Sequence, residues 1–219
     1  MNHVLRLTLQ TSAEQRVRLQ ALQSMFAQAC NELAQVAQEQ RCWNRVALHH
    51  LAYKRLRERY PTLGSQMVCN AVYSVCRAAR LVYQHPQSPF HLSRLGERAL
   101  PLMRFAENCA VYFDRHTLSV RAGRLSMFTL DGRMRFELAL AAGDEQAFHH
   151  SKLREVVLAR RPDGEYELTF WLQGVAQATE PDPKHPAAAA GPTTPASLEA
   201  SASPSEHEWP EFLMVEALP

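Results

Sequence analysis

The sequence predicts an α+β fold: a small, OB-like antiparallel β-barrel with a three-helix insertion after its first strand, followed by a disordered tail. Three observations predict it. Residues 3–9 alternate between apolar and polar side chains, and apolar residues then recur every three or four positions up to residue 83. From Phe90 the apolar spacing changes to a period of two. Beyond Gly174 the composition turns to Pro, Ala and Ser.

These changes divide the chain into four segments. We expect the first barrel strand in residues 1–10, a helical lobe in 11–89, the rest of the barrel in 90–174 and a Pro/Ala/Ser-rich acidic tail in 175–219. With 219 residues, of which 46% are hydrophobic, the chain is long enough to bury a substantial core.

The first helix has a clear start. Thr11-Ser12-Ala13-Glu14 has the Thr-x-x-Glu spacing of a capping box, in which two backbone donors at a helix start are satisfied by side chains. We expect a long amphipathic helix that ends near Gln40. Its predicted buried positions are Leu22, Met25, Phe26, Ala29, Cys30, Leu33 and Ala34.

Two more helices follow. Asn44 is a suitable N-cap for a helix that Pro61 stops after Tyr60, and Ser65 can cap another that runs to about Tyr83. Residues 85–89, His-Pro-Gln-Ser-Pro, break the helical pattern. The predicted buried positions are Val46, Leu48, Leu51, Ala52 and Leu56 in the second helix, and Met67, Val68, Ala71, Val72, Val75, Ala79 and Val82 in the third.

The remaining barrel strands are expected as hairpins around tight turns. Asp131-Gly132 is a strong two-residue hairpin signal, and Pro162-Asp163-Gly164 is another turn signal. With the first strand, these five or six strands could close a small barrel. The expected pairs are Val111–Phe113 with Thr117–Arg121, Leu125–Leu130 with Arg133–Leu140, and Lys152–Arg161 with Glu165–Leu172.

The tail contains one apolar stretch. Residues 176–205 have the composition of a disordered linker, but Trp209–Val215 is apolar within an acidic context. Two interpretations of this stretch stay open, a short docking peptide and a frayed chain end.

Several classes of protein are disfavoured. The sequence has no run of about 18 apolar residues and no signal-peptide pattern at its start, so we expect a cytoplasmic protein without a membrane partner. Five cysteines without a C-x-x-C pair disfavour a disulfide framework or a zinc ribbon. Neither His49-His50 nor His149-His150 chelates a metal unaided, because adjacent helical residues point about 100° apart. We expect neither a metal site nor a cofactor.

The charge is unevenly distributed. Residues 1–178 hold 23 Lys and Arg against 15 Asp and Glu, a net charge of +8, whereas residues 179–219 carry −6. Arg outnumbers Lys 21 to 3, and its planar guanidinium suits bidentate contact with phosphate. A basic body with an acidic tail is typical of nucleic-acid-binding proteins. The tail could also fold back on the basic surface and compete with nucleic acid.

Four short motifs carry a family resemblance. Leu5-Arg6-Leu7-Thr8-Leu9 with Thr11-x-x-Glu14-Gln15, and Tyr60-Pro61-Thr62-Leu63-Gly64-Ser65-Gln66, come first. Leu125-Ser126 with Thr129-Leu130-Asp131-Gly132-Arg133, and residues 155–168, follow. In this order they resemble the TnpB (OrfB) family of insertion-sequence RNA-guided nucleases, relatives of the small type V CRISPR effectors, over roughly residues 1–173.

The resemblance implies a function in gripping nucleic acid. In that family the barrel is the wedge domain and the helices are the recognition lobe. Together they hold a structured guide RNA and its target DNA and read a short transposon-adjacent motif. By this resemblance Gln66 faces the motif duplex, where its amide could pair with an adenine edge, and Asn70 is its weaker companion.

The sequence departs from the family after Gln173. Family members continue into a RuvC nuclease domain with three separated acidic metal ligands, and many carry a C-x-x-C…C-x-x-C zinc finger. Two-metal hydrolysis needs carboxylates fixed on rigid elements, whereas Asp182, Glu199, Glu206 and Glu208 lie in linker-like sequence. We therefore expect no catalytic residue here, and cleavage only if a separate RuvC-type subunit supplies it.

The candidate nucleic-acid contacts are cations that could neutralise phosphates. A solvated surface, or for the second helix a favourable match to the helix dipole, explains the same residues without a ligand. Tyr53, Tyr60 and Tyr73 could stack on bases or simply pack. The candidate cations are Lys54, Arg55, Arg57, Arg59, Arg77, Arg80, Arg94, Arg98, Arg121, Arg124, Arg133 and Arg135.

Three alternatives to an RNA-guided binding module remain. The chain could be a protein-interaction scaffold that docks a partner through its acidic tail, a truncated and inactive transposon remnant, or an autonomous DNA-binding regulator. The last is disfavoured because no pair of compact helices joined by a short Gly turn is recognisable as a helix-turn-helix.

Overall fold

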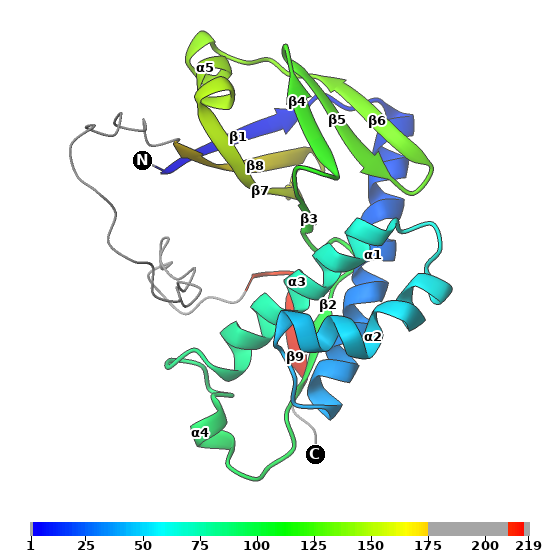
Figure 1. Ribbon diagram of the computed structural model, residues 1–219, viewed down its shortest axis with the longest axis vertical. Coiled ribbons are helices and arrows are strands. Elements are labelled where there is room, and N and C mark those ends of the chain that lie inside the picture. The colour runs from blue at the N-terminus through cyan, green and yellow to red at the C-terminus, as the bar shows by residue number, and fades with distance from the viewer. Residues whose placement is uncertain (1, 175–209, 217–219) are drawn as a thin grey trace, which may run out of the picture.

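The computed structural model describes residues 2–174 and 210–216, which form a mixed α+β fold (Figure 1). The helices are α1 (Ala13–Glu39), α2 (Arg45–Arg59), α3 (Ser65–Tyr83), α4 (Leu92–Leu95) and α5 (Ala142–His150). The strands are β1 (Asn2–Leu9), β2 (Leu102–Phe105), β3 (Val111–Phe113), β4 (Leu118–Arg121), β5 (Arg124–Thr129), β6 (Gly132–Glu137), β7 (Ser151–Arg160), β8 (Tyr166–Gly174) and β9 (Leu213–Glu216).

Helix α1 links the two halves of the molecule. Figure 1 shows most of the strands in one half and α2, α3 and α4 in the other, with α1 running beside both. Buried residues from the three long helices and from the strands belong to one continuous hydrophobic cluster. The helical and strand parts are therefore packed on a shared core.

The start of α1 lies one residue later than the sequence predicts. Ser12 is the N-cap, and its hydroxyl accepts from the Gln15 N–H at 3.2 Å while the Gln15 side chain accepts from the Ser12 N–H at 2.9 Å. The Thr11 hydroxyl instead accepts from Arg16 Nε at 3.0 Å. The capping box is thus present, but it is Ser12/Gln15 and not Thr11/Glu14. The predicted helix end near Gln40 is confirmed.

The predicted second and third helices are confirmed. Asn44 caps α2 by accepting from two backbone N–H groups. All seven predicted apolar positions of α3 are buried, but in α2 the prediction is wrong for Val46 and Leu51, which are 65% and 52% exposed. Ser65 is the first helical residue of α3, and Gly64 precedes it as an N-cap without a side-chain bond.

Hydrogen bonds join the described strands into three antiparallel sheets and not into one closed barrel. One sheet has the order β1-β8-β7-β3, one β4-β5-β6 and one β2-β9. The β5–β6 and β7–β8 hairpins confirm the predicted turns, at which Gly132 and Gly164 adopt φ of 110° and 88°. Such positive φ angles favour glycine.

The predicted pairing of residues 111–113 with 117–121 is wrong. β3 pairs with β7, and β4 pairs with β5. Between them the Asp114 carboxylate accepts from the His116 and Thr117 N–H groups at 3.0 and 3.1 Å. This side-chain turn redirects the chain from the four-stranded sheet into the three-stranded one.

Amide side chains of α1 hold the backbone of the segment from residue 100 to 109, which contains the unforeseen strand β2. The Asn31 side chain bonds both the N–H and the carbonyl oxygen of Phe105, at 2.7 and 2.9 Å. Gln23 donates to the Cys109 carbonyl at 3.0 Å, and Gln38 donates to that of Leu100. Residues 23, 31 and 38 lie about seven or eight positions apart, so they share one helix face.

Part of the predicted disordered tail forms a strand. Residues 213–216 pair with β2 as β9, and the Ala106 N–H donates to the Phe212 carbonyl at 2.9 Å. Residues 175–209 and 217–219, to which the rest of the predicted tail belongs, lie outside the described residues, as does Trp209. Within the described ranges, no helix has the length and apolarity needed to cross a membrane.

Replacing Asn31 with Ala tests the α1 amide contacts. The variant leaves both Phe105 backbone groups without their side-chain partner, so we expect the free energy of unfolding to fall by about 1–3 kcal/mol in urea denaturation. Gln28→Ala is the matched control, because Gln28 is an exposed amide of the same helix and its side chain donates to the Ser24 hydroxyl one turn earlier. A loss of similar size in both variants would contradict this role for Asn31.

Candidate nucleic-acid interface

Two of the four candidate cations on α2 are bound to α1. Arg55 and Arg59 contact opposite oxygens of the Glu32 carboxylate at 2.8 and 3.2 Å, and the Tyr60 hydroxyl donates to the same group at 3.2 Å. Burial and the nearby Glu32 raise the pKa of Tyr60. This cluster attaches the C-terminal half of α2 to α1, so its two arginines are already partly neutralised within the fold.

The other two α2 cations differ from each other. Lys54 is exposed, and its side chain forms no hydrogen bond or ion pair with a described residue. One Nη of Arg57 is buried and has no hydrogen-bond partner in the part of the chain that the structure describes. Of the four, Lys54 is therefore the most accessible to an external phosphate.

Of the four candidate cations between residues 77 and 98, two form contacts within the fold and two do not. Arg77 contacts Glu155 of β7 at 2.9 Å, and Arg94 closes its own loop by donating to the carbonyls of Ser88 and Pro86 at 2.8 and 3.2 Å. Arg80 and Arg98 are exposed, and their side chains form no hydrogen bond or ion pair with the described residues.

The candidates in the three-stranded sheet lie at different places along it: Arg121 and Arg124 flank the β4–β5 turn, and Arg133 and Arg135 lie on β6. Arg124 pairs with Glu137 at 3.1 Å, where both side chains are largely exposed. The Arg133 guanidinium lies 4.2 Å from the centre of the Phe128 ring and donates to backbone oxygens of Ser126 and His116. The exposed Arg121 and Arg135 side chains form no hydrogen bond, ion pair or ring contact with the described residues.

Gln66 and Asn70 have different environments. The Gln66 Nε2 donates to Asp114 Oδ2 at 2.6 Å, which ties the start of α3 to the turn after β3. Asn70 is only 5% exposed and donates to the Tyr112 carbonyl at 2.9 Å. Its amide therefore joins α3 to β3, and the Tyr73 hydroxyl joins α3 to β7 by donating to Glu155 at 2.7 Å.

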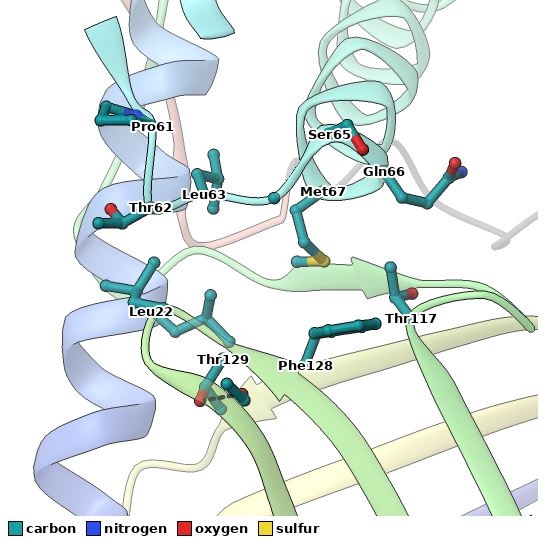
Figure 2. A pocket seen from close by; sticks show the side chains of 13 residues that line it. Leu22, Pro61, Thr62, Leu63, Ser65, Gln66, Met67, Thr117, Phe128 and Thr129 are labelled. Atoms are coloured by element: carbon teal, nitrogen blue, oxygen red, sulfur yellow. Dashed lines mark hydrogen bonds between the residues drawn. The ribbon is translucent and has the colours of Figure 1, made fainter. Parts of the chain in front are cut away.

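A cavity of about 440 Å³ separates the helical part from the three-stranded sheet (Figure 2). The turn before α3 and the first residues of that helix form one wall, and β5 with the β5–β6 turn forms the other. Figure 2 shows the Phe128 ring facing the cavity below Met67. Its lining includes the apolar Leu22, Leu63, Met67 and Phe128 and the polar Ser65 and Gln66.

Asp114 fixes the orientation of the Gln66 amide. An ionised carboxylate only accepts hydrogen bonds, so the amide nitrogen must face Asp114. The Gln66 Oε1 has no hydrogen-bond partner among the described residues and is left to accept from a ligand. The cavity thus combines an aromatic ring with an apolar wall, and the Gln66 amide is held at its rim by Asp114, which suits a flat heterocycle.

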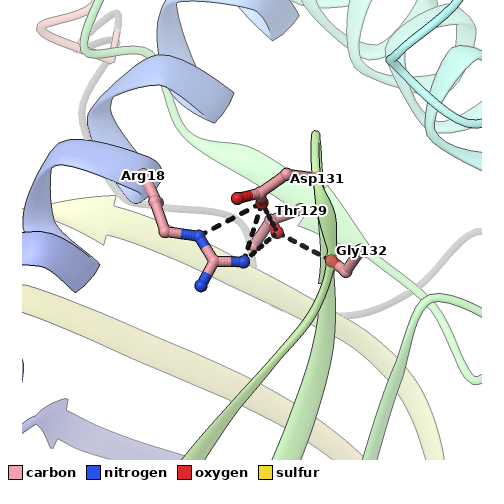
Figure 3. A network of polar contacts seen from close by, with 4 residues as sticks. All are labelled: Arg18, Thr129, Asp131 and Gly132. Atoms are coloured by element: carbon pink, nitrogen blue, oxygen red, sulfur yellow. Dashed lines mark hydrogen bonds and ion pairs between the residues drawn. The ribbon is translucent and has the colours of Figure 1, made fainter.

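The β5–β6 turn is held against α1 by a polar network (Figure 3). Arg18 contacts Asp131 Oδ1 through Nη2 at 2.7 Å and Nε at 3.1 Å. The Thr129 hydroxyl lies 2.8 Å from the same oxygen and 2.7 Å from the Gly132 carbonyl, and it donates to one of them at a time. Hydrogen bonds from Arg18 and Thr129 lower the pKa of Asp131.

The sequence did not single out two residues of this site. Phe128 occupies an outward position of a predicted strand. An exposed aromatic side chain at such a position could have indicated a binding surface. Arg18 lies 113 residues from Asp131, and nothing in the local pattern of either residue indicates that they meet. The cavity itself depends on this long-range contact, because Thr129 and Gly132 line it.

Comparisons with known proteins give no family for this chain: no family model matches it, and no curated protein matches it. In residues 2–174 and 210–216, no group of three or more His, Cys, Asp or Glu side chains is placed to hold a metal ion. The five cysteines, all within the described residues, are free thiols.

Replacing Arg18 with Ala tests the network at the turn. We expect the pKa of Asp131, measured by NMR titration, to rise towards its ordinary value, and the Gly132 amide to exchange faster with solvent. Because the fold lowers this pKa, the associated stability is present above the unfolded-state pKa and is lost as pH falls through the folded-state pKa. Arg16→Ala, which breaks the contact with Glu165, should change neither observable.

Proposed function

We propose that this chain is a nucleic-acid-binding module and that the cavity between the start of α3 and the β5–β6 hairpin is its contact site. The observation that carries the proposal is the exposed aromatic ring of Phe128, with the Arg133 guanidinium beside it, in a cavity that Gln66 also lines. An unpaired base can stack on such a ring irrespective of its sequence, and the amide oxygen favours a base that presents an amino group.

Exposed cations elsewhere on the surface would provide the sequence-independent part of the affinity. Phosphate neutralisation needs accessible positive charges that are not already paired. The exposed cations without a hydrogen bond or ion pair among the described residues meet this condition better than Arg55, Arg59 and Arg77. Those exposed candidates are Lys54, Arg80, Arg98, Arg121 and Arg135.

The resemblance to the TnpB family extends the proposal to the ligand and the partners. In the extended proposal, α1 to α3 act as the recognition lobe of this chain, and its two larger sheets act as an OB-like wedge. The bound species are a structured guide-like RNA and, through it, target DNA in the cytoplasm. Cleavage then requires a separate RuvC-type subunit, because this chain offers grip and not catalysis.

Co-purification tests the choice of ligand. The protein is expressed with its flanking genomic sequence, purified at moderate salt, and the RNA that stays bound is sequenced. We expect one structured RNA species with defined ends, resistant to a wash that removes non-specific RNA. Random fragments lost at the first rise in salt would contradict an RNA-guided function.

Substitutions in the cavity test the contact site. Phe128→Leu keeps apolar volume but removes the stacking face, so we expect binding of a fluorescent single-stranded oligonucleotide to weaken by about 1–3 kcal/mol. Arg133→Ala removes the guanidinium that lies beside the Phe128 ring, so we expect it to weaken binding of the same oligonucleotide as well.

Lys152→Ala is the matched control for these variants. Lys152 is an exposed cation on β7, in the four-stranded sheet, and it does not line the cavity. Its loss should leave the affinity nearly unchanged. Equal weakening by Lys152→Ala and Arg133→Ala would indicate diffuse charge attraction and would contradict a contact site at the cavity.

A further inference from the structure

The two edges of β2 are satisfied in different ways. On one edge, the backbone of Phe105 is bonded by the Asn31 side chain of α1. On the other edge, β2 pairs with β9 in four successive registers, from Leu102 opposite Glu216 to Phe105 opposite Leu213. Helix α1 thus holds the strand on its inner side, and the C-terminal segment of the chain covers its outer side.

The α1 contacts hold β2 in place without help from β9. Gln38 and Gln23 bind the backbone on either side of the strand, at Leu100 and Cys109. The Tyr83 hydroxyl adds a bond to the Pro101 carbonyl at 2.6 Å. Because these partners all come from α1 and α3, the outer edge of β2 is a preformed row of backbone donors and acceptors.

The segment that occupies this edge has the chemistry of a peptide ligand. Leu213 is 6% exposed and Val215 packs on the core, whereas Met214 between them is 54% exposed. Glu216 contacts Arg104 at 3.4 Å. When an extended peptide adds to the edge of a sheet, backbone hydrogen bonds provide the affinity and alternate side chains provide the selectivity. Here the side chains at alternate positions and the Glu216 carboxylate at the end of the strand would have the second role.

The contact of β9 with the body is short, and its connection to the body is long. β9 is four residues long and, among the described strands, pairs with β2 alone. The preceding described strand, β8, ends at Gly174, so 38 residues lie between the two strands in the sequence. A ligand segment that belongs to the same chain binds in an intramolecular step, which favours its occupancy of the site over that of a free peptide.

We propose that the outer edge of β2 is an exchangeable peptide-docking site. Its ligand is an extended segment with aliphatic side chains at alternate positions followed by a carboxylate. Residues 210–216 fill the site within the same chain, and the same residues of a second copy fill it by exchange. Arg104 selects the acid, and the buried position of Leu213 and the partly buried position of Val215 select the aliphatic side chains.

The experiment begins with the intact folded chain. A protease site is inserted between Ala190 and Gly191, the folded protein is cut there, and retention of the C-terminal fragment is followed by native mass spectrometry and by fluorescence of a label on that fragment. We expect the fragment to stay bound after cutting and to dissociate on dilution. An excess of a synthetic peptide of residues 208–219, which stands in for the second copy, should displace it.

Peptide variants show whether the recognition follows the structure. Leu213→Asp in the peptide should weaken displacement by at least about tenfold, because a charge replaces a buried aliphatic group. Met214→Ala is the matched control on the outward face and should change it by less than about twofold. Glu216→Arg should weaken displacement by a few-fold, and Arg104→Glu in the cut protein should restore it.

Three outcomes would overturn the proposal. Immediate loss of the fragment on cutting, at every concentration tried, would show that the edge has no affinity of its own for the segment. A fragment that stays bound over days against excess peptide would show that β9 is a permanent strand of the fold. Equal displacement by the Leu213→Asp and wild-type peptides would likewise exclude the proposed recognition.

Discussion

The fold depends on one constraint: the backbone between residues 100 and 109 must find hydrogen-bond partners while it lies against a helix. Buried N–H and carbonyl groups without partners are costly, and a helix has no free backbone groups along its length to offer. Helix α1 meets this need with Gln23, Asn31 and Gln38, whose amides mimic the edge of a strand. A strand can thereby pack on the side of a helix with its polar groups satisfied.

The same helix also determines the shape of the candidate site. N-terminal to its amide contacts with β2, α1 places Arg18 against the β5–β6 turn. Further along the same helix, Glu32 holds the C-terminal half of α2. The turn that leads from α2 into α3 forms one wall of the cavity, and the β5–β6 hairpin forms the other. Both walls are thus positioned from one rigid element, which favours a preformed site over one that must assemble on binding.

Local pattern in the sequence predicts the long helices and the two hairpins, because each depends on contacts within a few residues. Asn44 marks the start of α2 and Gly132 marks the β5–β6 turn in this way. The short strands β2 and β9 were missed because their stability comes from partners far along the chain. Barrel closure failed for a similar reason: the Asp114 turn sends β4 into a second sheet, a choice that alternation of side chains does not encode.

The distinction between local pattern and long-range contact also decides which candidate site residues the sequence could identify. Counting cations identifies positive charge, but not which charges the fold itself uses, and Arg55, Arg59 and Arg77 each meet a carboxylate of the chain. Some of the cations of the body are therefore paired in contacts that also hold the fold together. What distinguishes the cavity from the rest of the surface is then its shape and its lining: an aromatic ring beside a guanidinium, with an amide at the rim whose direction a neighbouring carboxylate sets. In the proposed function, the ring stacks on a base, a contact that depends on shape and that net charge alone does not provide.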